Sequence, residues 1–280
     1  MVDAQAPAAG VRWEQVGTIG WLVLARPHRH NAIDASMMTE IGLTLAAAQS
    51  DPQVKVVVIR GEGPSFSAGF DLASDGEAVT QATGNDAVAE LARLRKNIEQ
   101  MFQVWDFPKP VIAAVHGYCL AGASMLASLC DITVVADDAR IGVSALPLGG
   151  GYITPLWMHL VGPKRAKQMA FQPGETMSGA QSAEWGWANY AVAADELLDD
   201  VTALAHRIAR TPATTLQMKK HAINRLCELQ GFRAQAMLGA ELDALLHFSD
   251  ETARVWNTVR ELGFKQAVAD FRSSPDGHHD

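Results

Sequence analysis

The chain has 280 residues, which is enough for one large domain with a sizeable hydrophobic core. Apolar residues make up 48% of it and charged residues 19%, the composition of an ordinary globular protein. The formal net charge is −8 and there is no basic run, which argues against a nucleic-acid partner. A small anion is not excluded, because binding one needs only a few local cations.

Three cysteines, Cys119, Cys130 and Cys227, are widely spaced and form no CxxC motif. This spacing argues against both a disulfide framework and a thiolate zinc site, so we predict no metal. The N-terminal residues have neither the basic flank nor the apolar core of a signal peptide. These features predict a cytoplasmic protein.

The first elements in chain order alternate between strands and helices. Residues 18–26 and 54–61 read as strands, and residues 35–51 between them have helical apolar spacing, with Asp34 as the N-cap. The uncharged run 111–130 is long enough to span a bilayer. Glycines and serines interrupt it, however, so we interpret it as a buried strand followed by a buried helix rather than a membrane segment.

Another apolar strand is predicted at residues 131–137. Strands that alternate with helices predict parallel pairing in an α/β domain, which we assign to residues 1–195. After residue 195 only helical patterns remain, so we assign residues 196–270 to a helical region and 271–280 to a disordered tail. Leucines in this region, such as Leu238, Leu242 and Leu245, exceed what an isolated tail can bury. They predict packing on the first domain or on another subunit.

The common catalytic motifs are absent from the sequence, including GxSxG, GxGxxG, the P-loop and HExxH. Two glycine-containing corners remain, at residues 62–72 and 116–125, and each follows an apolar strand. Amides of two such corners that converge on one point would form an oxyanion hole for a carbonyl gaining negative charge. The alternative interpretation is that both are simple crossover turns, for which glycine is the usual residue.

Five blocks of the sequence together resemble the crotonase superfamily, also called the enoyl-CoA hydratase/isomerase family. In chain order they read ARPHRHNAID, GPSFSAGFDL, KPVIAAVHGYCLAGASMLASLCDITVVADD, VGPKRAKQMAF and GAQSAEWGWAN. The resemblance implies a crotonase-type spiral of ββα units, followed by a helical C-terminal trimerisation region. It also implies a homotrimer or homohexamer that binds an acyl-CoA thioester and needs no cofactor, since CoA is part of the substrate. The interpretation of residues 111–130 as a buried strand and helix predicts no membrane partner.

The resemblance assigns roles to individual residues. The amides that hold the thioester oxygen in this family correspond to those of Phe70 and Gly122, and Asp71 matches a loop-closing aspartate. Arg26 and Arg29 are candidates for CoA phosphates, since guanidinium groups suit phosphate geometry. The remaining candidates for the substrate or CoA are Ala68, Gly69 and Trp157.

The sequence departs from the family at the two glutamates with which family hydratases handle water. Met125 occupies the first position and Ala145 the second. A general acid or base contributes about 10²–10⁴ to a rate, and an oxyanion donor about 10²–10³. The site is therefore expected to retain electrostatic stabilisation of an enolate and to lack the proton transfer of ordinary hydration.

Four side chains are candidates to replace the missing acids. Tyr152 follows Ala145 in a glycine-rich loop, and His116 precedes the small-residue helix, where it can equally hydrogen-bond to backbone. Asp75 and Glu77 follow the first corner.

Three hypotheses remain open from the sequence. The first is a lyase, isomerase or hydrolase that stabilises an acyl-CoA enolate. The second is a non-catalytic acyl-CoA-binding protein. The third is a weak hydratase that uses a displaced acid.

Overall fold

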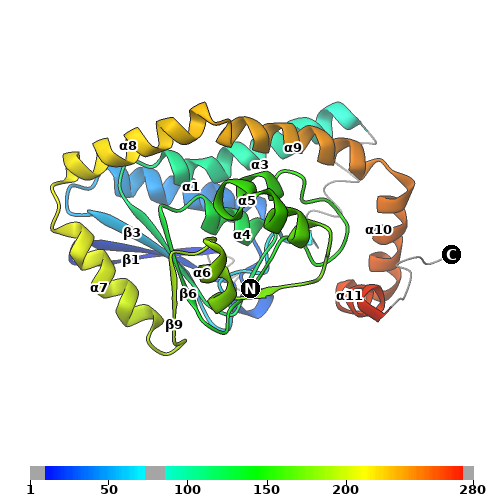
Figure 1. Cartoon of the computed structure of the whole chain (residues 1–280), viewed down its shortest axis with the longest axis horizontal. Helices are drawn as coiled ribbons and strands as arrows, with labels where there is room; N and C mark the ends of the chain where they lie inside the picture. Colours follow the sequence, from blue (N-terminus) through cyan, green and yellow to red (C-terminus); the bar gives the residue numbers. More distant parts are fainter. Residues whose placement is uncertain (1–9, 73–85, 274–280) are drawn as a thin grey trace, which may run out of the picture.

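A six-stranded sheet forms the centre of the protein (Figure 1), whose computed structural model describes residues 10–72 and 86–273. Its first strand is antiparallel to the second and all others are parallel. In spatial order its strands are β1 (Val11–Val16), β2 (Ile19–Leu24), β3 (Val56–Gly61), β4 (Val111–Val115), β6 (Ile132–Ala136) and β9 (Tyr190–Val192). The predicted parallel α/β core is confirmed.

A second, smaller sheet contains β5 (Tyr118–Leu120), β7 (Arg140–Gly142) and β8 (Met177–Ser178). β5 runs parallel to β7, and β7 runs antiparallel to β8. An isolated bridge from Ser67 to Cys119 extends this sheet to the first glycine corner. The small sheet therefore connects the two glycine corners, because β5 belongs to the second corner and pairs with the first.

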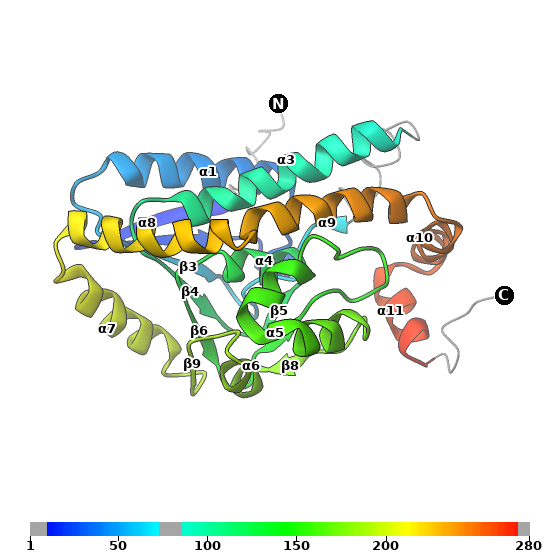
Figure 2. The ribbon, with the colours of Figure 1, turned by 45° about the horizontal axis from the view of Figure 1, so that its top comes forward.

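Helices cover both faces of the large sheet (Figures 1 and 2). Those before residue 195 are the 3₁₀ turn η1 (Pro27–Arg29) and the helices α1 (Ala35–Ser50), α3 (Ala87–Asp106), α4 (Gly122–Ser128), α5 (Thr154–Ala170) and α6 (Gly179–Trp185). Asp34 caps α1 as predicted, since its carboxylate accepts the amide of Met37 at 2.9 Å.

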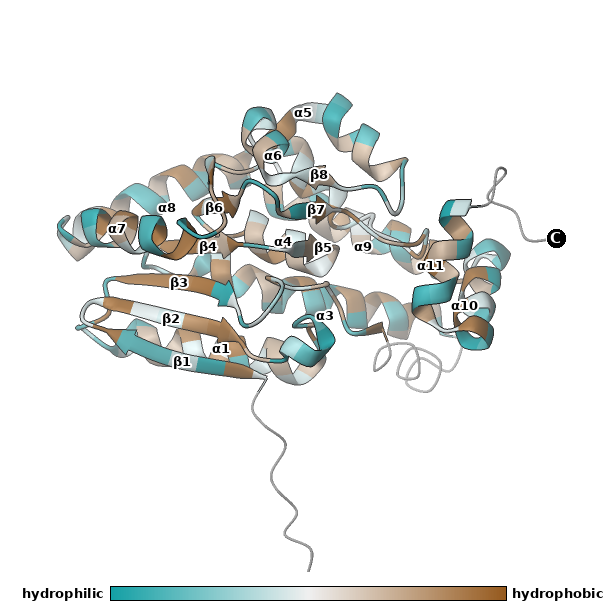
Figure 3. Cartoon of the chain, turned by 90° about the horizontal axis from the view of Figure 1, so that it is seen from below, coloured by the Kyte–Doolittle hydropathy of each residue, from teal (hydrophilic) through white to brown (hydrophobic). Residues whose placement is uncertain are grey.

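The central strands are buried on both faces, as continuous apolar runs predict. Val56, Val57, Val58 and Ile59 of β3 have no exposed surface. Figure 3 shows the same pattern as brown segments in β2 and β3. The uncharged run 111–130 forms β4, β5 and α4, which confirms the strand-and-helix interpretation. Among the residues that the structure describes, no helix is long and apolar enough to cross a membrane.

The C-terminal region is entirely helical within the described residues. It contains α7 (Leu197–Ala209), α8 (Ala213–Leu229), α9 (Phe232–His247), α10 (Asp250–Leu262) and α11 (Phe264–Ser273). α7 packs on the large sheet, α9 packs on α3 and α5, and α10 and α11 lie together at one end of the molecule (Figure 1). α11 extends past residue 270, where the predicted tail was to begin, and residues 274–280 lie outside the description.

Leucines on the outer faces of α8 and α9 remain exposed. Leu226 and Leu229 on α8, and Leu238, Leu242 and Leu245 on α9, do not pack on the first domain within this chain. The sequence predicted that these leucines pack either on the first domain or on another subunit. Packing on the first domain is therefore excluded for these residues.

Candidate active site

The first corner, residues 62–72, lies along the edge of the small sheet. Ser67 donates its amide to Tyr118 O at 2.9 Å and accepts the amide of Leu120 at 3.2 Å. Gly69 follows with φ +98°, a conformation that favours glycine. A Cβ on Gly69 would lie 2.6 Å from Leu120 O, so the backbone here directly contacts the second corner.

The second corner turns at Ala121, which has φ +47° and ψ −120°. Such a conformation is strained for a residue with a side chain, and strain of this kind concentrates at functional sites. The turn is held because the Ala121 amide donates to Gly142 O at 3.0 Å and its carbonyl accepts the amide of Met125 at 3.1 Å. Gly122 then begins α4, where the first amides of a helix have no intrahelical partner.

The two corners converge. The Cβ position of Gly69 would lie 3.3 Å from Gly122 N, and a Cβ on Gly122 would lie 2.6 Å from the ring of Phe70. Within the described part of the chain, neither the Phe70 N–H nor the Gly122 N–H donates a hydrogen bond to a protein acceptor. An oxyanion hole needs two neighbouring N–H groups that are free to donate to the same oxygen, and these two corners supply such groups.

The two positions of the missing glutamates have different environments. Met125 is completely buried in the hydrophobic core. Ala145 is partly exposed and lines a cavity of about 50 Å³ beside Leu120.

Tyr152 lies next to the first corner. The residue is 6% exposed, and its ring centroid is 6.2 Å from that of Phe70. The structure thus brings together three predicted site residues, Phe70, Gly122 and Tyr152, from separate parts of the chain.

Asp243 on α9 holds the loop that carries Tyr152. Its carboxylate accepts the amides of Gly151 at 2.9 Å, Gly150 at 3.2 Å and Tyr152 at 3.4 Å. Burial raises the pKa of Asp243, and these amides offset part of that rise because they stabilise the charged form. One turn earlier, a Cβ on Gly239 would lie 2.1 Å from Gly151 O, so α9 and the loop touch backbone to backbone.

A buried ionic cluster continues from Asp243 along α9. His247, one turn later, makes a 2.7 Å contact from Nδ1 to Glu90 of α3, and Arg93 donates two hydrogen bonds to the same carboxylate at 2.8 Å. Burial alone would raise the pKa of Glu90, but the hydrogen bonds from Arg93 and His247 lower it to about 2. The sequence reasoning missed Gly239, Asp243, His247 and Glu90, because their partners are far away along the chain.

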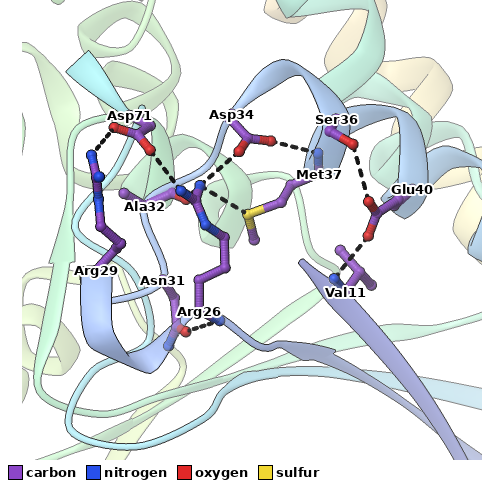
Figure 4. Close-up of polar contacts among 10 residues, drawn as sticks. All are labelled: Val11, Arg26, Arg29, Asn31, Ala32, Asp34, Ser36, Met37, Glu40 and Asp71. Carbon is purple, nitrogen blue, oxygen red and sulfur yellow. Dashed lines mark hydrogen bonds and ion pairs between the residues drawn. The ribbon is translucent and has the colours of Figure 1, made fainter. Parts of the chain in front are cut away.

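Arg26 and Arg29, from the loop before α1, form a second ionic cluster with Asp71 of the first corner (Figure 4). Asp71 is 3% exposed and accepts from Arg26 at 3.0 Å and from Arg29 at 2.8 Å. Arg26 also donates to Asp34 at 2.7 Å and to Ala32 O at 2.9 Å. Its guanidinium is therefore committed within the protein, whereas the Arg29 side chain is 42% exposed; the CoA role of both stays a prediction.

The remaining candidates from the sequence make contacts within the protein. His116 contacts Gly63 O through Nε2 at 2.9 Å, the backbone alternative that the sequence left open. Ala68 donates its amide to His30 O at 2.8 Å. Trp157 is fully buried, with its ring centroid 5.5 Å from that of Trp187.

Two of the candidate acids cannot be placed. Asp75 and Glu77 fall outside the described residues. No cluster of His, Cys, Asp and Glu suited to a metal ion occurs within residues 10–72 and 86–273.

Comparisons with known proteins agree with this architecture. Residues 14–254 match the family model described as enoyl-CoA hydratase/isomerase. The chain is 30% identical over 230 residues to a putative enoyl-CoA hydratase of Thermus thermophilus, covering 80% of this chain and 88% of the relative. It is 33% identical over 212 residues to the 2,3-dehydroadipyl-CoA hydratase of Escherichia coli, covering 74% and 79%.

Solved structures give the same result. The crystal structure of a putative enoyl-CoA hydratase/isomerase from Novosphingobium aromaticivorans superimposes with a TM-score of 0.88 at 39% identity, covering 95% of this chain and 96% of that one. An enoyl-CoA hydratase from Mycobacterium smegmatis gives a TM-score of 0.86 at 30% identity, covering 97% and 95%. The chain therefore belongs to the enoyl-CoA hydratase/isomerase family, the crotonase superfamily.

Proposed function

We propose that the protein binds an acyl-CoA thioester, places its carbonyl oxygen between the amides of Phe70 and Gly122, and stabilises the derived enolate. The observation that carries this proposal is the convergence of the two corners, where the Gly69 Cβ position is 3.3 Å from Gly122 N. Preorganised backbone amides need no reorganisation when charge develops on the oxygen, so they act selectively on the transition state.

Ordinary hydration is not the proposed reaction. Hydration requires one group to activate water and another to deliver a proton to the α-carbon. Met125 and Ala145 can do neither, and the complete burial of Met125 leaves no room for water beside it. We therefore favour decarboxylation, in which loss of carbon dioxide forms the enolate without a base. Double-bond isomerisation and carbon–carbon bond hydrolysis are the alternatives, and each needs a base or an activated water from elsewhere in the site.

Tyr152 is the proposed proton donor to the enolate. Its ring lies beside Phe70 at a centroid distance of 6.2 Å, and Asp243 fixes its backbone. A phenol that is buried next to a developing anion is suited to proton transfer.

The test combines binding and turnover. Trans-2-enoyl-CoA thioesters of increasing chain length would be followed by loss of the conjugated absorbance and by calorimetry. Saturated acyl-CoA would be followed by exchange of α-protons with deuterium, in which the Tyr152 phenolate takes the proton from the α-carbon and the phenol, after exchange with solvent, returns a deuteron. We expect binding and exchange without rapid hydration, and about 10²-fold slower exchange for Tyr152→Phe with binding retained. Tyr190→Phe, which alters a tyrosine on β9, is the matched control.

A second candidate is a non-catalytic acyl-CoA-binding protein, which the core burial of Met125 favours. Tight binding with neither exchange nor turnover would support it. Rapid loss of the enoyl absorbance would instead support a weak hydratase with a displaced acid, for which Asp75 and Glu77 are the candidates.

We also propose that the protein assembles as a homotrimer or homohexamer through the outer faces of α8 and α9. Leu226 on α8 is 62% exposed, and Leu245 on α9 is 69% exposed. Adjacent apolar side chains in such numbers on one surface are typical of a protein interface.

A further inference from the structure

The cavity beside Ala145 is lined by two arginines from distant parts of the chain. Arg140 belongs to β7 and Arg272 to α11, and they share the cavity with Tyr118, Ser144, Ala145 and Thr176. Its volume of about 50 Å³ leaves room for one carboxylate group or about three water molecules. Among the residues that the structure describes, no Asp or Glu lines it.

The two guanidinium groups have no acidic partner within residues 10–72 and 86–273. Arg272 donates to Gly174 O, and Arg140 stacks over the Tyr118 ring at 5.9 Å, but neither forms an ion pair in this part of the chain. Two cations that face one cavity without a counter-charge repel each other, and an anion between them removes that repulsion. The hydroxyl-bearing Ser144 and Thr176 add possible donors for the same anion.

This cavity adjoins the converging corners. Leu120, which lines it, is two residues before Gly122, and its carbonyl lies against Gly69. Ala145 also lines it, so a longer side chain at that position would reduce the space that the two arginines line. The short alanine leaves this space for a group brought by a ligand.

We propose that Arg140 and Arg272 bind a carboxylate carried by the acyl group of the substrate, so that the preferred ligand is a CoA thioester of a dicarboxylic acid. This inference rests on the proposed function, because it assumes that the thioester is held at Phe70 and Gly122. Arginine suits the role, since its planar fork can meet both oxygens of one carboxylate.

The test uses matched pairs of thioesters that differ in the terminal carboxylate. Calorimetry would compare succinyl-CoA with butyryl-CoA, glutaryl-CoA with pentanoyl-CoA, and adipyl-CoA with hexanoyl-CoA. We expect at least one dicarboxylic member to bind about tenfold more tightly than its partner, as one charge-assisted pair predicts. Arg140→Gln and Arg272→Gln should each remove this preference and leave the affinity for the uncharged partner unchanged.

Arg254→Gln is the matched control, because Arg254 lies on α10 with its side chain 63% exposed and does not line the cavity. Arg140 is the more decisive variant, since its loss does not disturb the contact between α11 and Gly174.

The outcomes separate the two proposals. Equal affinity within every pair, unchanged by the arginine variants, would overturn this inference and leave the proposed function intact. Failure of every thioester to bind would overturn both. Equal weakening of both members by Arg272→Gln would assign the cavity to a CoA phosphate, and arginine-dependent binding of free glutarate as tight as that of glutaryl-CoA would assign it to a free anion; either result would overturn the acyl assignment.

Discussion

Asp243 accepts the amide of Gly151 at 2.9 Å, a contact that joins the C-terminal helix α9 to the loop beside the candidate active site. Because the same carboxylate also accepts from Gly150 and Tyr152, one buried charge fixes three consecutive residues. The position of Tyr152 beside Phe70 therefore depends on Asp243, which lies 91 residues later in the chain.

Replacement of Asp243 by Asn should release this loop. An amide group offers one acceptor oxygen and no charge, so we expect a loss of about 2–3 kcal/mol in the free energy of unfolding. The chain has three tyrosines, Tyr118, Tyr152 and Tyr190, so selective isotope labelling resolves each by NMR. The Tyr152 signal should shift or broaden while the other two stay in place. The exposed Asp138→Asn is the control, and a uniform change of all three signals would contradict a local role.

Two helical glycines should respond oppositely to alanine. Gly239→Ala places a Cβ 2.1 Å from the backbone oxygen of Gly151, which cannot move away, so we expect a loss of about 1–3 kcal/mol. Gly42→Ala on α1 meets only the end of the Gln103 side chain, which can rotate. At Gly42 the higher helix propensity of alanine should dominate and raise the free energy of unfolding by about 0.5–1 kcal/mol. Urea unfolding of both variants measures the contrast, and similar effects would show that the α9 contact is adaptable.

The fold should lose stability in acid through Glu90. Hydrogen bonds from Arg93 and His247 outweigh burial and lower its pKa from 4.5 to about 2. The charged carboxylate therefore stabilises the native state at neutral pH. That contribution, about 3 kcal/mol, is lost as the pH falls through the window from about 4.5 to about 2. Asp243 contributes to the pH dependence in the opposite direction. Because burial raises its pKa, its ionisation at neutral pH lowers the free energy of unfolding.

Urea unfolding between about pH 5 and about pH 3 would measure this loss. Glu90→Gln should be less stable at neutral pH and should show a shallower pH dependence than the wild type. An unchanged slope would mean that other carboxylates dominate acid unfolding.

Restoring glutamates at both missing positions should not create an efficient hydratase. Met125→Glu buries a carboxylate in the hydrophobic core, where its charged form is strongly disfavoured. Ala145→Glu places a carboxylate between Arg140 and Arg272, which would pair with it. We expect less than a roughly tenfold gain in hydration of crotonyl-CoA and a clear loss of stability. Met125→Leu, which conserves volume, is the control for folding, and a gain of several hundredfold would refute this prediction.

Charges on the outer face of α9 should dissociate the assembly. The double variant Leu242→Asp, Leu245→Asp introduces two carboxylates into the exposed leucine surface. Sedimentation should show a trimer or hexamer for the wild type and a species of about 30.1 kDa for the variant. Leu43→Asp changes an equally exposed leucine on α1 and should leave the assembly unchanged. A monomeric wild type would contradict the proposed interface.

Local sequence patterns predicted much of the fold. Uninterrupted apolar runs identified β3, β4 and β6, and Asp34 marked the start of α1, because these signals depend on burial and capping within a few residues. The Gly69 and Gly122 corners were also predicted, since glycine at the end of a strand is a local feature.

The contacts that organise the site could not be predicted in this way. Asp243 looks like any acid in a leucine-rich helix until its partners, some ninety residues away, are known. Arg26 is a second example. The family resemblance makes it a candidate to bind a CoA phosphate, but in the fold its guanidinium group donates to Asp34, Asp71 and the carbonyl of Ala32. The sequence also could not distinguish the buried position of Met125 from the accessible one of Ala145.

The helix α9 has two faces with different tasks. Gly239, Asp243 and His247 face the loop and α3, while Leu238, Leu242 and Leu245 point outward. Because one helix carries both sets, a second copy seated on the leucines under the proposed assembly would also hold the loop that carries Tyr152. Under that proposal, the rate per chain of the proposed reaction should depend on protein concentration, falling when a dilute solution separates the copies and recovering when it is concentrated again.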